Sequence, residues 1–126
     1  MLEHAITGLL LVVAVIHLVP VSGFLGSRQL SALYGIDVGN PDLEILMRHR
    51  AVLFGIVGAF FVYSAFVPAL QPIAFAGATL SLLSFFYLAF AVGRYGPAIR
   101  KIVIGDVVAA ACLIAAIALY LMKDET

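Results

Sequence analysis

Two ionisable side chains lie inside long apolar stretches of the sequence, and they are the first candidates for chemistry. His17 follows a run of mostly aliphatic residues that begins near Ala5, and Asp106 lies near the start of the last apolar stretch. A charged group within the hydrocarbon of a bilayer is costly and is usually kept for function. A histidine and an aspartate at neighbouring depths could bind a polar ligand or pass a proton along.

The depths of His17 and Asp106 can be compared if both stretches cross a membrane as helices. With a rise of about 1.5 Å per residue, His17 lies roughly 12 Å and Asp106 roughly 6 Å from the inner edge of the hydrocarbon. This difference of about 6 Å allows the two side chains to meet directly or through a water. Pro20 adds polarity beside His17, because a proline inside a helix leaves the carbonyl of Ile16 without its hydrogen bond.

A basic run, Arg48-His49-Arg50, precedes the second apolar stretch. The long stem of an arginine lets its guanidinium choose its depth, so Arg50 can reach the zone of His17 and Asp106. We therefore predict a cytoplasm-facing polar pocket. Its predicted ligand-binding residues are His17, Tyr34, Arg48, His49, Arg50 and Asp106, with Ser22 beside them.

Two other interpretations use the same residues. In a structural one, Asp106 pairs with a nearby arginine to hold helices together, and neutral His17 donates a hydrogen bond to a carbonyl. In a catalytic one, His17 and Asp106 serve a small lipid-active or redox membrane enzyme. We predict no metal and no cofactor, because His4, His17 and His49 lie at different depths and form no HxxxH or HExxH pattern.

The composition excludes several classes of protein. Of the 126 residues, 64% are hydrophobic and 11% charged, which is more apolar surface than one soluble core of this size could bury. Seven basic and seven acidic residues give a net charge of zero, without the positive surface that nucleic-acid binding requires. The chain has no GxxxxGK[ST], GxGxxG or GxSxG motif for nucleotide binding or serine hydrolysis. These absences favour a non-enzymatic membrane protein.

The elements that must position the candidate residues are long apolar helices. A span needs about 20 apolar residues, and four stretches reach or approach this length. They cover residues 5–25, 51–67, 73–92 and 102–122. The expected fold is a single all-α integral membrane domain over residues 1–126, a four-transmembrane-helix bundle.

Proline, glycine and asparagine mark the ends of these helices. Asn40-Pro41-Asp42 predicts an N-cap and an acidic first turn well ahead of the second span. Pro68 and Pro72 predict a tight turn between the second and third spans. Gly93 is a predicted C-cap, and Pro97 can open the last helix.

The basic residues are distributed asymmetrically between the connections. Those before the second and fourth spans are Arg28, Arg48, Arg50, Arg94, Arg100 and Lys101, and Lys123 alone follows the last span. Because basic loops stay cytoplasmic, we predict that both termini lie on the periplasmic side. Small residues such as Ala51, Gly55 and Ala59 allow close helix packing, and the same spacing would serve a homodimer or a larger membrane complex.

Several short motifs resemble those of a known group of proteins. They are Leu33-Tyr34-Gly35, Asn40-Pro41-Asp42-Leu43, the stretch from Leu46 to Gly55, Pro68-Ala69-Leu70-Gln71-Pro72 and, in outline, His17-Leu18-Val19-Pro20 and Asp106-Val107-Val108. On these residues the chain resembles an uncharacterised family of small bacterial inner-membrane proteins with four helices. The resemblance implies a multi-pass protein of the bacterial inner (plasma) membrane.

Many members of that family carry the label phosphopantetheine adenylyltransferase. The soluble enzyme of that name resembles other nucleotidyltransferases in using a parallel α/β sheet and an HxGH-type motif to hold ATP phosphates. Here His17 is followed by Leu18 and Val19, and no other histidine begins such a motif. We therefore do not expect adenylyltransferase activity. The expected function is non-enzymatic, with the polar pocket binding or conducting a small or amphipathic ligand, and the alternatives are a structural or accessory membrane subunit and the membrane enzyme described above.

Overall fold

The computed structural model describes the backbone of residues 1–125 and the side chains up to Lys123, and this part of the chain is 89% helix with no strand. The α-helices are α1 (Leu2–Leu18), α2 (Ser27–Tyr34), α3 (Pro41–Ala65), α4 (Gln71–Val92) and α5 (Pro97–Glu125). Two 3₁₀ segments, η1 (Val19–Leu25) and η2 (Pro68–Leu70), follow α1 and precede α4.

Four segments of the described chain are long and apolar enough to cross a membrane. They are Leu2–Leu25, Pro41–Ala65, Pro68–Val92 and Pro97–Lys123. The predicted all-helical architecture with four candidate spans is therefore confirmed. The short helix α2 is an addition, because the sequence analysis treated its residues as part of a connection.

The predicted helix ends follow from local chemistry. The Asn40 side chain accepts a hydrogen bond of 2.8 Å from the Asp42 amide, which caps α3 at Pro41, well before the apolar span. Gly93 ends α4 with φ of 72°, a left-handed conformation that glycine adopts without steric cost. Pro20 has no amide hydrogen, and the chain changes from α-helix to 3₁₀ helix at Val19.

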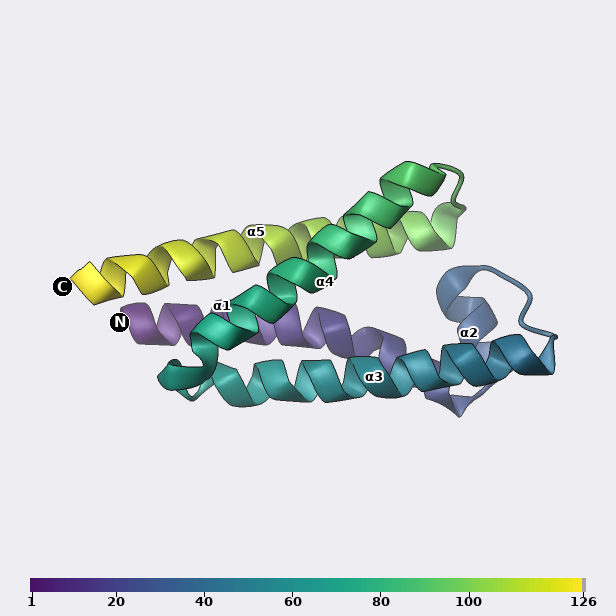
Figure 1. Cartoon of the computed structure of the whole chain (residues 1–126), viewed down its shortest axis with the longest axis horizontal. Helices are drawn as coiled ribbons and strands as arrows, with labels where there is room; N and C mark the ends of the chain where they lie inside the picture. The colour runs from purple at the N-terminus through teal and green to yellow at the C-terminus, as the bar shows by residue number, and fades with distance from the viewer. Residues whose placement is uncertain (126) are drawn as a thin grey trace.

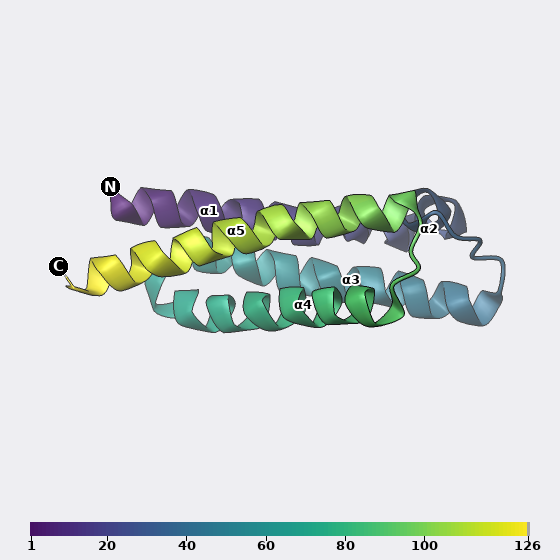
Figure 2. The same ribbon diagram turned by 90° about the horizontal axis from the view of Figure 1, so that it is seen from above.

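The helices form two layers, with α1 and α5 in one and α3 and α4 in the other (Figure 2). α1 packs along both α5 and α3, and its residues Ile6, Leu10 and Val13 are fully buried. Phe61 of α3 and Ala78 of α4 close the same core from the other layer. A smaller apolar cluster joins α2 to the start of α3 through Leu30, Tyr34 and Val38.

α1 and α3 lie close together at Gly58, which faces the Leu18 side chain and the Ala14 carbonyl oxygen. A Cβ atom at this position would lie 2.5 Å from Leu18 Cδ2, so only glycine allows the observed spacing. The sequence analysis assigned close packing to Gly55 and Ala59 instead, but Gly55 lies in ordinary contact with Val21 and Ala59 is exposed. Ala51, the first residue of that pattern, is 2% exposed.

Both termini lie at the same end of the bundle, together with the η2 turn (Figure 1). α3 and α4 begin side by side at this turn and diverge toward the opposite end, where α2 lies (Figure 1). That opposite end also carries the basic residues of α2, of the first half of α3 and of the α4–α5 connection. The divergence leaves space at the level where α1 changes to 3₁₀ helix.

Candidate functional site

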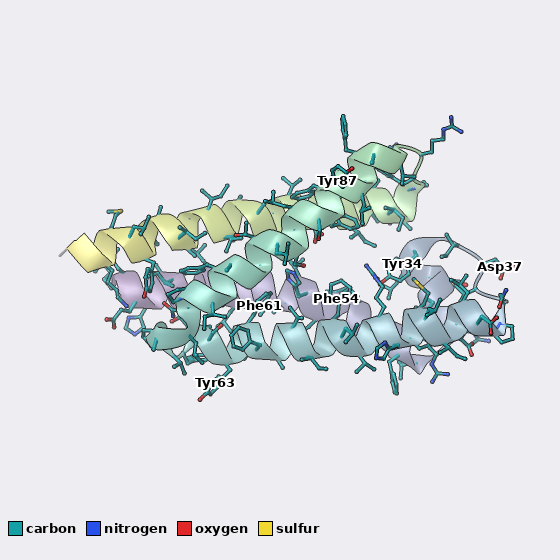
Figure 3. The ribbon with its side chains drawn as sticks, viewed as in Figure 1. Tyr34, Asp37, Phe54, Phe61, Tyr63 and Tyr87 are labelled. Carbon is teal, nitrogen blue, oxygen red and sulfur yellow. The ribbon has the colours of Figure 1, made fainter. Side chains whose placement is uncertain are left out.

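A cavity of about 820 Å³ lies between the diverging parts of α3 and α4. α1 and α5 form its back and α2 closes its end, so residues of all five α-helices line it. In Figure 3, Phe54 of α3 and Tyr34 of α2 lie on the side of α3 that faces this space. Four of the predicted site residues line the cavity: His17, Tyr34, Arg50 and Asp106.

His17 is 3% exposed and is held by two hydrogen bonds. Its Nδ1 lies 2.9 Å from the carbonyl oxygen of Val13, one turn earlier in α1, and its Nε2 lies 2.9 Å from the Ser81 hydroxyl of α4. A carbonyl oxygen can only accept, so Nδ1 carries a proton. In neutral His17 the Ser81 hydroxyl therefore donates to Nε2, and in the cation the direction reverses.

Arg50 is placed in the cavity by two aromatic side chains. Its guanidinium carbon lies 5.2 Å from the centre of the Tyr34 ring and 4.6 Å from that of Phe54. The guanidinium also donates a hydrogen bond to the Tyr34 hydroxyl. These contacts hold a cation without an acidic partner, since the structure gives Arg50 no carboxylate within ion-pair distance among the side chains up to Lys123.

Asp106 is half-buried and lines the cavity from α5. Within the described side chains its carboxylate forms no hydrogen bond and no ion pair. The basic groups that act on it electrostatically are His17 and Arg50. Asp106 therefore faces the cavity with its acceptor oxygens available to a ligand or to water.

We predict that Asp106→Asn changes the free energy of unfolding by less than about 0.5 kcal/mol, because no bond to the protein is lost. If a buried ion pair of Asp106 held the helices together, its removal should instead cost about 3–5 kcal/mol. Unfolding in mixed detergent and dodecyl sulfate, followed by circular dichroism, distinguishes the two values. The structural interpretation of Asp106 requires the larger one.

Arg48, His49 and Ser22 lie outside the cavity that holds the other predicted residues. Residues two apart on a helix point to different sides, so Arg48 and Arg50 of α3 cannot share one site. Arg48 donates a hydrogen bond of 2.9 Å to the Phe24 carbonyl and lies 3.9 Å from Glu44, the helical pair that their spacing favours. His49 is exposed, and the Ser22 hydroxyl donates to the Val19 carbonyl. The structure thus separates these three residues from the cavity.

The sequence analysis did not select several residues that line the cavity. Lys101 and Gly105 reach it from α5, Ser81 and Ser84 from α4, and Phe54 from α3. Ser81 carried a usable signal, because it is a polar residue in an apolar span. Lys101 contributed only to the predicted orientation of the chain in the membrane.

No group of three or more His, Cys, Asp or Glu side chains that could hold a metal ion occurs in the described part of the chain. Comparisons with protein-family models, curated proteins and solved structures found no match to this chain. The cavity itself is therefore the basis for a functional proposal.

Proposed function

We propose that this protein is a non-enzymatic inner-membrane protein that binds an amphipathic ligand in the cavity between α3, α4 and α5. The observation that carries the proposal is the combination of a largely apolar lining with Arg50 and Asp106, neither of which is ion-paired within the described side chains. A volume of about 820 Å³ lies within the usual range for small-molecule sites. Apolar walls with a few polar groups suit a ligand that has a polar head and an apolar body.

Binding is favoured over conduction by the packing beyond His17. Toward the end of the bundle that holds the termini, the side chains of Leu10, Val13 and Phe61 are at most 1% exposed. A conducting path needs a polar or hydrated route through this layer, whereas a binding site needs none. The cavity is thus proposed to be closed on this side.

The proposed orientation places the cavity at the cytoplasmic side. The basic residues gather at the α2 end, and basic connections stay cytoplasmic, which puts both termini on the periplasmic side. The assignment to a bacterial inner membrane rests on the family resemblance. Protease accessibility of tags at the termini in right-side-out vesicles tests the orientation.

A cavity-filling substitution tests ligand binding. Gly105 lines the cavity, and a Cβ atom there would meet nothing within 4 Å, so Gly105→Phe should fill the space without a clash. We expect this variant to lose at least about nine-tenths of the bound amphiphile, a loss of roughly 1.4 kcal/mol or more in binding. Native mass spectrometry of the protein in neutral detergent, with an equimolar mixture of phosphatidylglycerol and phosphatidylcholine of identical chains, measures the total adduct.

Gly8→Phe is the matched control, because Gly8 is also a helical glycine with open space around it but lies on α1 away from the cavity. It should retain the wild-type amount of adduct. If Gly105→Phe also retains that amount while folded, the ligand does not occupy this cavity and the proposed function is wrong.

A further inference from the structure

We infer that the ligand of the cavity is an anionic phospholipid, whose phosphate binds Arg50 and Lys101 while its acyl chains leave the protein between α3 and α4. This inference rests on the proposed function and names the class of ligand.

The charges that line the cavity are unbalanced. Arg50 and Lys101 are two cations, and Asp106 is the one carboxylate among the described lining residues. Neither Arg50 nor Lys101 forms an ion pair with an acidic side chain of the described part of the chain. Arg50, Lys101 and Asp106 together therefore leave an excess of one positive charge, which a ligand with one negative charge would balance. An excess of positive charge attracts anions, which favours an anionic occupant.

The Arg50 side chain is preorganised to bind an anion. Its guanidinium lies against the Tyr34 and Phe54 rings, and a single hydrogen bond, to the Tyr34 hydroxyl, engages its donors. The other N–H groups have no acceptor among the described residues and can form the paired hydrogen bonds that phosphate oxygens accept. Because aromatic contacts already restrict the side chain, binding costs little additional conformational entropy.

Lys101 supplies the second cation from the opposite wall. It is an exposed residue in the first turns of α5, so its ammonium can reach a phosphate at the mouth of the cavity while its stem lies along apolar surface. Asp106 lies one to two helical turns deeper on the same helix. A phosphate bound at Lys101 therefore lies nearer the basic end of the bundle than the Asp106 carboxylate, on which Arg50 also acts electrostatically.

The route to the cavity is lateral. α3 and α4 diverge toward this end and form the layer opposite α1 and α5 (Figures 1 and 2). On α4 the side chain of Leu88 lines the cavity and is 58% exposed, and Ser84 beside it is exposed too. In a bundle that spans the bilayer this opening meets lipid, so a phospholipid can insert its head while its chains stay among neighbouring chains. A soluble anion has no need of such an opening.

The test uses two neighbouring basic residues of α5. Lys101 lines the cavity, whereas Arg100 is equally exposed but does not. In native mass spectrometry from neutral detergent, which removes the surface potential of an anionic bilayer, wild type should bind phosphatidylglycerol in preference to phosphatidylcholine. Lys101→Gln should reduce that preference about fivefold, and Arg100→Gln should reduce it less than about twofold.

Four other results would overturn the inference, and each has a different meaning. If Gly105→Phe removes the adduct but the two lipids bind wild type equally, the cavity binds amphiphiles without charge selection and only the inference fails. If Lys101→Gln and Arg100→Gln have equal effects, the preference is a general attraction to the basic end. If inorganic phosphate at the lipid's concentration displaces phosphatidylglycerol, the ligand is a soluble anion. If Gly105→Phe leaves the adduct unchanged, the proposed function fails as well.

Discussion

Replacement of His17 by alanine is expected to lower the free energy of unfolding by about 3 kcal/mol. The imidazole is 3% exposed, and its ring lies 4.9 Å from that of Phe61 in an edge-to-face arrangement. Alanine would leave a void against Phe61 and would remove the link from α1 to Ser81 of α4. Dodecyl sulfate unfolding in mixed micelles, followed by circular dichroism, measures the loss.

Ser81→Ala separates the hydrogen bond from the packing of the His17 ring. It removes the partner of His17 Nε2 but leaves the ring in place, so we expect a loss of about 1 kcal/mol. The pair of values tests whether His17 is mainly a positioning residue of the cavity wall. A His17→Ala variant that keeps wild-type stability yet loses the amphiphile would identify His17 as a direct ligand contact.

The spans and their ends could be predicted because they depend on local sequence. About 20 apolar residues suffice for a span, and Asn40, Gly93 and Pro97 act within one turn of their own positions. α2 was missed because it is short and polar on one face, and its stability comes from burial of Leu30 and Tyr34 against other elements. Whether such a helix forms depends on its tertiary contacts with other elements.

Helix geometry allowed only part of the site to be predicted: the depth of each residue, but not the direction of its side chain. Depth along the bundle is set by residue number, so the levels of His17 and Asp106 could be compared from sequence. The direction of a side chain around its helix depends on packing, and this separates Arg50, which faces the cavity, from Arg48, which faces Phe24. A run of three basic residues on a helix cannot enter one pocket together. This geometric limit applies to His49 as well.

The shape of the cavity has a cause in the chain. α3 and α4 are tied together by the short η2 turn at one end, whereas their other ends connect to different partners, α2 and α5. α1 packs against α3 and α5 as far as Leu18, and the chain changes to 3₁₀ helix at Val19. The cavity begins at this level, since Ile16, His17, Val19 and Pro20 line it. Its position thus depends on how α1 packs against α3.

Because the cavity depends on the packing of α1 against α3, Gly58→Leu should disturb it. The new side chain would enter the space between Gly58 of α3 and Leu18 of α1. The new Cβ would lie 2.5 Å from Leu18 Cδ2 and 2.6 Å from Leu18 Cγ, too close for both to remain in place. We expect a loss of about 2–3 kcal/mol in the free energy of unfolding, the usual cost of overpacking. The same dodecyl sulfate titration measures it.

Gly8→Leu is the control for this substitution, because a Cβ atom at Gly8 would meet nothing within 4 Å. It makes the same chemical change in a helix and should leave stability within about 0.5 kcal/mol of wild type. Since Leu18 follows His17 directly, movement of Leu18 in Gly58→Leu should also displace the cavity wall and weaken phosphatidylglycerol binding. Gly58→Leu with unchanged stability and binding would mean that the Leu18 side chain does not restrict position 58, and that the cavity does not depend on this packing.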